Sequence, residues 1–325
     1  MSQRILVTGG AGFIGSHLSE RLLNDGNTVM VIDDLTTGSI DNILHLKVNQ
    51  NFKYYLDTIL RKSLLLELID EADTIFHLAA AVGVELIIKN PTRTIETNIR
   101  GTDIVLDLAQ KKNKKVIVTS TSEVYGKSNK QKFKEDDDLI LGPTTKSRWS
   151  YAASKIIDEF LALAYYKDKG VPVVIFRLFN IVGPRQTGQY GMVLPRFVKQ
   201  ALSNQPITVY GDGSQTRTFL HVYDAVNAFL KVISCPESCG NIYNIGGDEE
   251  ISILSLAKTV KTLLDSSSEI IFVPYSEAYE KGFEDMHRRV PDVTKINSLT
   301  GWKQELSLEK IIKDIAGYQL NKGQL

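Results

Sequence analysis

The chain has 325 residues, and its 38 Lys and Arg balance 38 Asp and Glu, so its formal net charge is zero. Hydrophobic residues make up 43% and charged residues 23%, which are ordinary globular proportions and exclude wholesale disorder. Nucleic-acid-binding and polybasic membrane-surface proteins need a broad positive field that this neutral chain lacks, so we expect neither nucleic acid nor a membrane as a partner.

The two cysteines are too few for a disulfide framework, and their spacing fits no common metal site, so we expect no metal. Apolar sequence begins at Ile5 without a basic and then apolar leader. No apolar run approaches the roughly 20 residues that a membrane-spanning helix needs. These features predict a soluble cytoplasmic protein.

Short, β-branched runs alternate with longer segments of helical periodicity through the first half of the chain. The predicted strands are Arg4–Thr8, Thr28–Asp33, Thr74–Leu78, Lys115–Ser120 and Val171–Phe179. The predicted helices between them are Phe13–Asn24, Pro91–Lys112 and Tyr151–Lys169. Continuous apolar strands that alternate with helices are typical of an α/β fold, a doubly wound parallel sheet with helices on both faces.

The regular alternation fades after about residue 180, where the chain becomes rich in Gly, Pro and polar residues. We expect residues 1–180 to form a cofactor-binding domain, to which 217–240 return with a helix at His221–Ile233. Residues 181–216 and 241–325, including a strand at Asn241–Ile245, are predicted to form a smaller, interleaved α/β substrate domain.

A glycine-rich loop, Thr8–Gly15, connects the first predicted strand to the first predicted helix. Gly10, Gly12 and Gly15 fit G-x-G-x-x-G, and Gly9 with the last two fits G-x-x-G-x-x-G. Glycines at these positions let the backbone turn tightly and approach a pyrophosphate, which the amino end of the helix then binds. A plain Gly-rich turn is the alternative, but the strand and helix on either side favour a Rossmann-type dinucleotide site.

The second strand ends at Asp33, 18 residues beyond Gly15, where an acidic residue binds the ribose hydroxyls of a dinucleotide. Its carboxylate would repel a 2′-phosphate, and Asp34 stands where an arginine would serve NADP. We therefore expect NAD as the cofactor.

Tyr151 and Lys155 lie four residues apart at the start of a predicted helix, so their side chains share one face. A lysine ammonium next to a phenol lowers the phenol pKa from about 10 towards neutral pH. Such a tyrosinate can take a proton from a sugar hydroxyl. A surface tyrosine beside a solvated lysine is the alternative interpretation.

A hydroxyl-rich stretch follows the strand Lys115–Ser120, at the edge where open α/β sheets bind ligands. In it, Thr121 and Ser122 can bind a substrate hydroxyl, and Glu123 adds a carboxylate. These hydroxyls could instead cap the next turn.

In order along the chain, these motifs resemble the extended short-chain dehydrogenase/reductase family of NAD-dependent nucleotide-sugar epimerases, dehydratases and decarboxylases. The resemblance rests on Thr8–Gly15, Val31–Gly38, His77–Ala80, Asn98, Tyr151 with Lys155, Arg177–Asn180, Gly183–Arg185 and Tyr210–Gly213. The likeness covers nearly the whole chain.

The resemblance assigns cofactor contacts to a set of positions spread over the first half of the chain. They are Gly9, Gly12, Phe13, Ile14, Asp33, Asp34, Thr36, Gly38, Asp57, Thr58, Leu78, Ala79, Ala80, Asn98, Tyr151 and Lys155. Asp57 departs from the usual pattern, because Leu56 precedes it in place of a glycine.

Substrate contacts are implied at Arg148, Asn180, Arg185, Val193, Tyr210, Arg217 and Arg289. Within this set, the resemblance implies that Arg217 and Arg289 bind the diphosphate of a UDP-sugar. Arg148 or Arg185 could bind a sugar carboxylate bidentately.

Within the family, the motifs are closest to UDP-glucuronate decarboxylases, because Ser122 precedes Glu123 and Arg148 stands three residues before Tyr151. The leading expectation is oxidation at C4 of UDP-glucuronate followed by decarboxylation, with Thr121, Ser122, Glu123, Tyr151 and Lys155 as catalytic residues. A UDP-sugar 4-epimerase is the alternative, followed by a 4,6-dehydratase and then a non-catalytic NAD-binding regulator. The family also implies a homodimer, paired through the helices 91–112 and 151–169.

Overall fold

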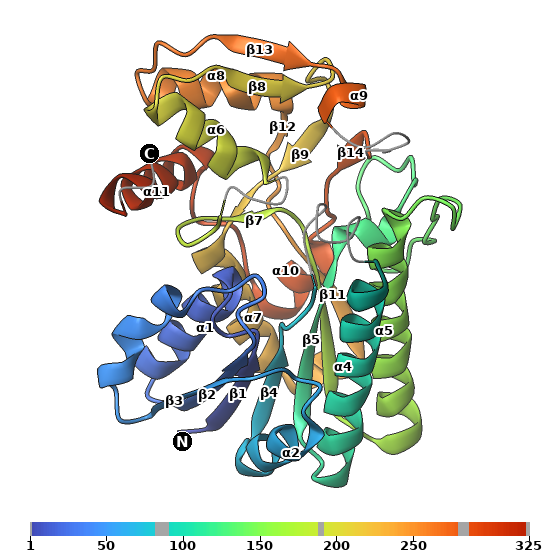
Figure 1. Ribbon diagram of the computed structural model, residues 1–325. Coiled ribbons are helices and arrows are strands. Elements are labelled where there is room, and N and C mark those ends of the chain that lie inside the picture. The colour runs from blue at the N-terminus through green and yellow to red at the C-terminus, as the bar shows by residue number, and fades with distance from the viewer. Residues whose placement is uncertain (1, 82–90, 188–191, 279–285, 323–325) are drawn as a thin grey trace.

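The computed structural model describes residues 2–81, 91–187, 192–278 and 286–322, and a seven-stranded sheet forms its centre (Figure 1). The strand order is β11-β6-β5-β4-β1-β2-β3, and every neighbouring pair is parallel. The strands are β1 (Arg4–Thr8), β2 (Thr28–Asp33), β3 (Phe52–Leu56), β4 (Thr74–His77), β5 (Lys115–Thr121), β6 (Val173–Leu178) and β11 (Asn241–Ile245). The predicted Rossmann-type fold is confirmed.

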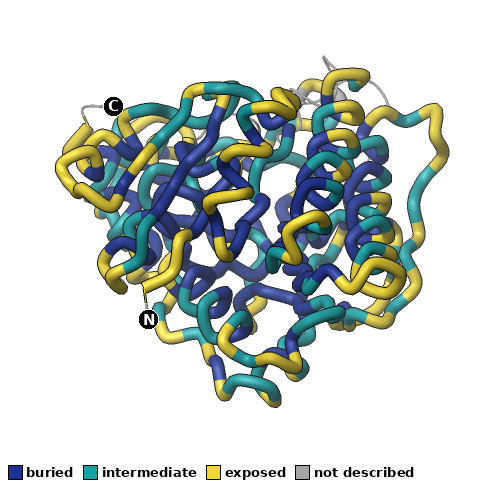
Figure 2. The backbone as a smooth tube through the Cα atoms, turned by 90° about the horizontal axis from the view of Figure 1, so that it is seen from below, coloured by how far each residue is buried: buried dark blue, intermediate teal, exposed yellow. Residues whose placement is uncertain are grey.

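Helices cover both faces of this sheet. One face carries α1 (Phe13–Asn24), α7 (Val222–Ile233) and α10 (Thr294–Thr300), and the other carries α2 (Lys62–Glu71), α4 (Pro91–Lys111) and α5 (Trp149–Lys169). Side chains alternate along a strand, so Ile5 and Val7 of β1 lie in the apolar core under α1 and α7, and Leu6 lies in the core under α2, α4 and α5. Figure 2 shows the buried backbone running through the middle of the molecule, with exposed turns around it.

A smaller part of the chain lies at one end of the large sheet (Figure 1). It contains α6 (Val193–Leu202), α8 (Ile253–Leu263) and α11 (Leu308–Asn321) around a separate apolar core, beside the parallel pair β8 (Ile207–Tyr210) and β13 (Ile270–Val273). Two small sheets lie nearby: β9 (Thr216–Thr218) between β12 (Glu250–Ser252) and β14 (Arg288–Arg289), and β7 (Ile181–Val182) with β10 (Leu220–His221). The remaining short helices are η1 (Ile40–Asn42), η2 (Leu44–Val48), η3 (Ser122–Tyr125), η4 (Pro236–Ser238) and α9 (Tyr275–Ala278).

The structure revises one predicted boundary between the two parts. Strand β11, which the sequence analysis placed with the smaller part, pairs with β6 at the edge of the large sheet. Helix α10 likewise packs on α7 and β11. The predicted strand at β11 is therefore correct, but it belongs to the large sheet. The division into two domains itself stays a prediction.

Helices α4 and α5 pack side by side along the outside of the sheet, as Figure 1 shows. Each has 21 residues, yet no helix in the described part of the chain is long and apolar enough to cross a membrane. Their outer surface nevertheless exposes large apolar side chains. Phe160 is 68% exposed, Ile157 is 42% exposed and Ile95 is 38% exposed.

Phe176 of β6 is fully buried and stacks on Phe229 of α7, with ring centroids 4.7 Å apart. Its truncation should therefore lower the stability of the protein strongly. We expect Phe176→Ala to lower the free energy of unfolding by about 3–5 kcal/mol in urea denaturation, because it leaves a cavity between strand and helix. Phe272→Ala, at a position that is 55% exposed, is the matched control and should change stability by less than about 0.5 kcal/mol. Similar losses in the two variants would contradict this account of the core.

Candidate active site

A cavity of about 700 Å³ lies where the carboxyl ends of the large sheet's strands meet the smaller part of the chain. Its volume is in the range of small-molecule sites. The predicted site residues that line it are Gly9, Gly12, Phe13, Ile14, Asp33, Asp34, Thr36, Gly38, Asp57, Thr58, Leu78, Ala79, Ala80, Thr121, Ser122, Glu123, Arg148, Tyr151, Asn180, Arg185, Val193, Tyr210, Arg217 and Arg289. Asn98 and Lys155 are not among its lining residues. The structure thus brings the predicted set together, while the role of each residue stays a prediction.

The glycine-rich loop has no room for side chains at two of its positions. A Cβ atom on Gly15 would lie 2.2 Å from the Gly9 carbonyl oxygen. One on Gly9, whose φ is +71°, would lie 2.8 Å from the Ala79 backbone nitrogen. Helix α1 then begins after Gly12 without a side-chain cap, so its amino end offers backbone N–H groups and a positive dipole at the cavity. These features fit the pyrophosphate of a dinucleotide.

Asp33 closes the same loop from the end of β2. Its Oδ2 accepts a hydrogen bond from the Ala11 N–H at 2.9 Å, and its Oδ1 accepts one from the Leu35 N–H at 2.8 Å. Burial raises the pKa of the Asp33 carboxyl, and the two backbone donors oppose that rise. Each carboxylate oxygen keeps a second lone pair, so Asp33 can still accept bonds from ribose hydroxyls.

Near Asp33, an arginine that the sequence analysis did not single out lines the cavity. Arg93 of α4 donates to the Thr36 hydroxyl at 3.0 Å, and its guanidinium lies 3.9 Å from the Asp34 carboxylate. The negative charge of Asp34 balances this arginine. Two carboxylates against one arginine favour a ribose with free hydroxyls over a 2′-phosphate.

Tyr151 lies in the first turn of α5 and faces the strand end at Thr121. Its phenol interacts with the Thr121 hydroxyl, which slightly favours the phenolate, but burial and the nearby carboxylates of Glu123 and Asp158 raise the pKa of Tyr151 above its usual value. Thr121 also caps η3, because its Oγ1 accepts a hydrogen bond from the Glu123 N–H at 3.3 Å. Capping and substrate binding are therefore both open to this hydroxyl.

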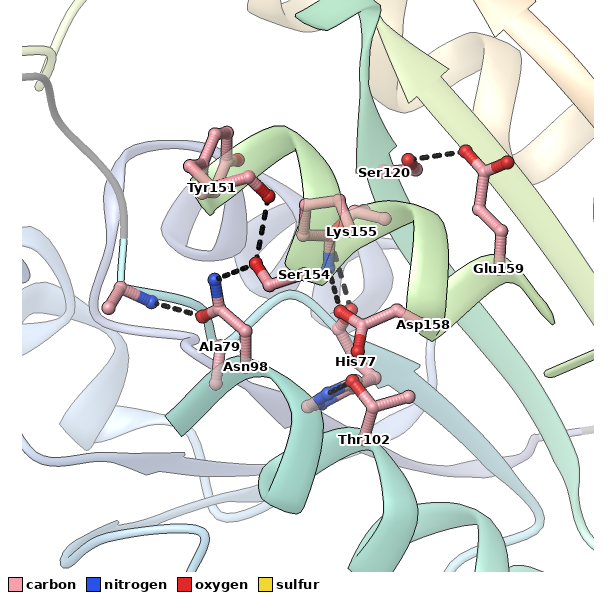
Figure 3. A network of polar contacts seen from close by, with 12 residues as sticks. His77, Ala79, Asn98, Thr102, Ser120, Tyr151, Ser154, Lys155, Asp158 and Glu159 are labelled. Carbon is pink, nitrogen blue, oxygen red and sulfur yellow. Dashed lines mark hydrogen bonds and ion pairs between the residues drawn. The ribbon is translucent and has the colours of Figure 1, made fainter. Parts of the chain in front are cut away.

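Lys155, the second member of the predicted Tyr151–Lys155 pair, forms a buried ion pair within α5. Its ammonium donates to Asp158 Oδ2 at 2.7 Å, and both side chains are buried (Figure 3). Burial, followed by the carboxylates of Glu123 and Asp158, raises the pKa of Tyr151 overall, and the lowering expected from Lys155 stays a prediction. Asp158 stands three residues after Lys155, so their side chains lie on the same face of α5.

Asn98 lies behind the cavity wall, where it links three segments of the chain. Its Oδ1 accepts a hydrogen bond from the Ala81 N–H at 2.8 Å, and its Nδ2 donates to the Ser154 hydroxyl at 3.0 Å. Ser154 in turn donates to the Tyr151 carbonyl oxygen at 2.8 Å. Asn98 therefore ties α4 to the chain after β4 and to the first turn of α5, where Tyr151 lies.

Two arginines face the cavity from adjacent strands of the smaller part. Arg217 of β9 and Arg289 of β14 are partners in the parallel register, so their side chains leave the same face of the sheet. Like charges in such positions repel each other, and an anion between them would relieve the repulsion. Arg289 also contacts Glu123 across the cavity, with Nη1 and Oε1 3.4 Å apart.

The two arginines considered for a sugar carboxylate differ in their surroundings. The Arg185 guanidinium lies 2.5 Å from the Glu20 carboxylate of α1, so its charge is already paired. Arg148 is 7% exposed, directly precedes α5 and lies 5.4 Å from the ring centre of Trp149. Arg148 enters the cavity at the start of the helix that carries Tyr151. Both arginines line the cavity, and the choice between them as a carboxylate ligand stays a prediction.

Arg93, Asp158 and Arg196 were not predicted from the sequence. The Arg196 guanidinium lies 3.9 Å from the ring centre of Tyr210. The spacing from Lys155 could have pointed to Asp158. The other two depend on how distant elements pack, and no local pattern reports that.

The fold and the site define a Rossmann-type enzyme with a parallel sheet and a glycine-rich loop. In its cavity, the half that fits a dinucleotide faces a half that is lined by arginines. The family model described as GDP-mannose 4,6 dehydratase matches residues 6–315, and the chain belongs to this family. The family resemblance and the class of NAD-dependent nucleotide-sugar enzyme inferred from the sequence are thereby confirmed.

Proteins of similar sequence or structure align with most of this chain. The UDP-N-acetyl-alpha-D-glucosaminuronate decarboxylase of Bacillus cytotoxicus is 43% identical over 315 residues, which are 97% of each protein. The UDP-glucuronic acid decarboxylase 2 of Arabidopsis thaliana is 37% identical over 94% of this chain and 66% of its own length. A crystal structure of UDP-glucuronic acid 4-epimerase from Bacillus cereus, in complex with UDP-glucuronic acid and NAD, is 30% identical, has a TM-score of 0.88 and covers 98% of this chain and 99% of its own.

The glycine loop predicts a loss of dinucleotide binding in Gly15→Ala. The added methyl would meet the Gly9 carbonyl oxygen and push the loop away from the amino end of α1. We expect the NAD dissociation constant, measured by calorimetry, to rise by at least about tenfold, which corresponds to about 1.4 kcal/mol. Gly317→Ala is the matched control, because its Cβ would have no neighbour within 4 Å. Unchanged NAD affinity in a folded Gly15→Ala protein would remove the loop from the cofactor site.

Proposed function

We propose that this protein uses NAD to decarboxylate a UDP-linked hexuronate, and that UDP-glucuronate and UDP-N-acetylglucosaminuronate are the candidate substrates. One observation carries the proposal: Tyr151, Glu123 and Arg148 line the cavity together where the glycine-rich half meets the arginine-lined half. The names of two relatives, at 43% and 37% identity, support the reaction and the substrate class.

When bound, NAD would supply hydride chemistry at C4 of the sugar. The side-chain-free loop at Gly9 and Gly15 fits its pyrophosphate, and Asp33 fits a ribose. The structurally similar UDP-glucuronic acid 4-epimerase from Bacillus cereus was crystallised with both UDP-glucuronic acid and NAD. This complex supports the proposal that one half of the cavity binds NAD and the other half binds a UDP-sugar.

The proposed chemistry begins with Tyr151, which takes the proton of the C4 hydroxyl as that carbon becomes a ketone. The ketone is then β to the carboxylate on C5. The bond between C5 and the carboxylate breaks, its electron pair moves towards the ketone oxygen, and carbon dioxide leaves. As the electron pair returns from the ketone oxygen, C5 takes up a new proton in place of the carboxylate, and Glu123 assists this delivery, while Thr121 and Ser122 bind sugar hydroxyls. Tyr151 gives its proton back to the C4 oxygen when the ketone is reduced to give a UDP-pentose; the 4-keto sugar is the product if reduction does not follow.

The remaining part of the substrate would occupy the arginine-lined half of the cavity. Arg217 and Arg289, side by side on adjacent strands, fit the diphosphate. Arg148 fits the uronate carboxylate, and Asn180, Val193 and Tyr210 line the space for the nucleoside. Arg185, paired with Glu20, is the second choice for the carboxylate.

A 4-epimerase acting on a UDP-sugar is the second candidate function. The similarity to UDP-glucuronic acid 4-epimerase, with a TM-score of 0.88, favours it, because that enzyme's name includes the same uronate. In an epimerase, the ketone would be reduced on its other face and the carboxylate would stay in place. A 4,6-dehydratase ranks third, and a non-catalytic NAD-binding regulator ranks last.

The proposal includes a homodimer in which α4 and α5 of two copies pair. The apolar side chains that these helices expose, Phe160 above all, support such an interface. A cytoplasmic location remains a prediction from the sequence.

The proposed reaction predicts release of carbon dioxide from at least one of the two UDP-uronates. We expect mass spectrometry of the product to show the loss of one carboxylate carbon, with NAD present and no other oxidant consumed. A UDP-uronate product that keeps all its carbon would establish the epimerase and exclude the decarboxylase. Tyr151→Phe should lower kcat by about 10²–10⁴ and leave NAD bound. Tyr166→Phe, on the exposed part of the same helix, is the control and should keep full activity.

The proposed dimer predicts that Phe160→Glu yields a monomer in light scattering coupled to size-exclusion chromatography. A carboxylate at the centre of an apolar helix interface would lose hydration without gaining a partner. Phe272→Glu, on β13 of the smaller part, is the matched control and should leave the dimer intact. A wild-type protein that is monomeric at micromolar concentration would overturn this interface.

A further inference from the structure

A buried asparagine joins three parts of the chain near the cavity. Asn244 of β11 is fully buried, and its Oδ1 accepts a hydrogen bond from the Tyr125 hydroxyl at 2.8 Å. Its Nδ2 donates to the Phe133 carbonyl oxygen at 2.9 Å and to the Asp292 carbonyl oxygen at 3.3 Å. Both ends of the amide are therefore used, and they link η3 to two segments that lie far from it in the sequence.

The segment from Gly126 to Ile140 brings Phe133 to this asparagine. It leaves η3 and returns to it, because Gly126 and Ile140 pair as a β-bridge. A Cβ atom on Gly126, whose φ is +59°, would lie 2.1 Å from the Ile140 carbonyl oxygen, so this close return requires glycine. In the middle of the segment, the Phe133 N–H donates to the Val290 carbonyl oxygen at 2.9 Å, and the Phe133 carbonyl oxygen accepts from the Asp292 N–H at 2.8 Å. The segment is thus held against the residues that follow β14.

The two sides of this link each carry a charged side chain into the cavity. Glu123 stands two residues before Tyr125, and Arg289 stands three residues before Asp292. The two charged groups face each other across the cavity, with Arg289 Nη1 3.4 Å from Glu123 Oε1. Asn244 therefore connects the backbones that carry them.

Apolar contact alone does not fix this arrangement. The Tyr125 ring stacks on the Phe133 ring with centroids 4.8 Å apart, but apolar contact is non-directional, whereas hydrogen bonds have preferred distances and angles. The Tyr125 hydroxyl also accepts a hydrogen bond from Arg177 Nη1 at 2.9 Å, and Arg177 forms a buried ion pair with Glu159 of α5. The hydroxyl at the end of η3 is thus held between Arg177 and Asn244.

We propose that Asn244 is a positioning residue that sets the separation between Glu123 of η3 and Arg289 of β14. Its amide binds the Tyr125 hydroxyl on one side and the backbone after β14 on the other. Moving either segment away would leave a buried polar group without a partner, which is unfavourable. The inference deepens the proposed function, and it rests on that function only where it assigns the delivery of a proton to Glu123.

The separation is tested without substrate by a crystal structure of Asn244→Leu. Leucine is similar in size and has no polar side-chain atom, so it removes the hydrogen bonds to Tyr125, Phe133 and Asp292 together. We expect Glu123 Oε1 and Arg289 Nη1 to lie further apart than in the wild-type protein crystallised in the same form. An unchanged separation in the folded variant would overturn the proposal.

Turnover of the two UDP-uronates tests whether this separation matters for the reaction. In Asn244→Leu, we expect formation of the decarboxylated product to fall at least about tenfold, because a misplacement of about 1 Å can cost about a hundredfold in rate. The preceding oxidation at C4, followed by the absorbance of NADH in a single turnover, should keep its rate, because it uses Tyr151 of α5. Equal losses in both steps would contradict a role through Glu123.

A double-mutant cycle with Glu123→Gln identifies the group through which Asn244 acts. In a protein that already lacks the Glu123 carboxylate, Asn244→Leu should lower product formation by less than about twofold, because both substitutions then affect the same interaction. Losses that multiply would show that Asn244 acts elsewhere and would reject its role as a positioning residue for Glu123.

Asn241→Leu is the matched control, because Asn241 lies on the same strand and its Nδ2 also donates to two carbonyl oxygens. These belong to Glu237 at 3.1 Å and to Cys239 at 3.3 Å, at the amino end of β11 and away from the cavity. This variant should keep both the separation of Glu123 from Arg289 and the rate of product formation.

Losing a buried amide can unfold a protein, so Tyr125→Phe provides a second variant. It removes only the hydroxyl that binds Asn244 and keeps the ring that stacks on Phe133. We expect the same increase in separation and the same selective loss of product formation, and wild-type behaviour in both measurements would overturn the proposal. A changed separation without carbon dioxide release from either uronate would support the role of Asn244 and reject the proposed substrate.

Discussion

The close backbone contact between Gly9, Gly15 and Ala79 is the constraint on which the rest of the site depends. A Cβ atom at Gly15 or Gly9 would lie within 3 Å of backbone atoms, so the turn between β1 and α1 can form only without side chains there. That turn aims the amino end of α1 at the cavity and brings the chain after β4 against the loop. The carboxyl ends of the parallel strands then lie along one edge, and the cavity forms there.

The placement of charges determines what this neutral chain can bind. Two arginines lie side by side on β9 and β14 and create a local positive site, although the chain as a whole has zero net charge. Carboxylates at Asp33 and Asp34 disfavour a further phosphate at the opposite end of the cavity. An anionic sugar nucleotide and a dinucleotide can therefore bind in one cavity without competing for the same groups.

The sequence was sufficient to predict the central strands, because β1, β2, β4, β5 and β6 are buried and continuously apolar. It did not predict β3, which lies at the edge with partly exposed side chains, and it assigned β11 to the smaller part, because no local pattern reveals which sheet a strand joins. Residues that line the cavity were predictable where a motif fixes the backbone, as at Gly12 and Asp33. The partner of Lys155 was not identified, because the spacing to Tyr151 was considered and the equally close Asp158 was not.

In the proposed reaction, one phenol must act as a base at C4 and later as an acid at the same oxygen. Burial and the carboxylates of Glu123 and Asp158 raise the pKa of Tyr151, and Lys155 of the same helix is bound by Asp158. The C4 steps are common to decarboxylation, epimerisation and dehydration, so Tyr151 cannot distinguish these outcomes. The difference arises at C5, where a carboxylate is lost, kept or absent. Arg148 and Glu123 line the cavity together with Tyr151, and we propose that these two side chains, rather than the phenol, carry the choice of reaction.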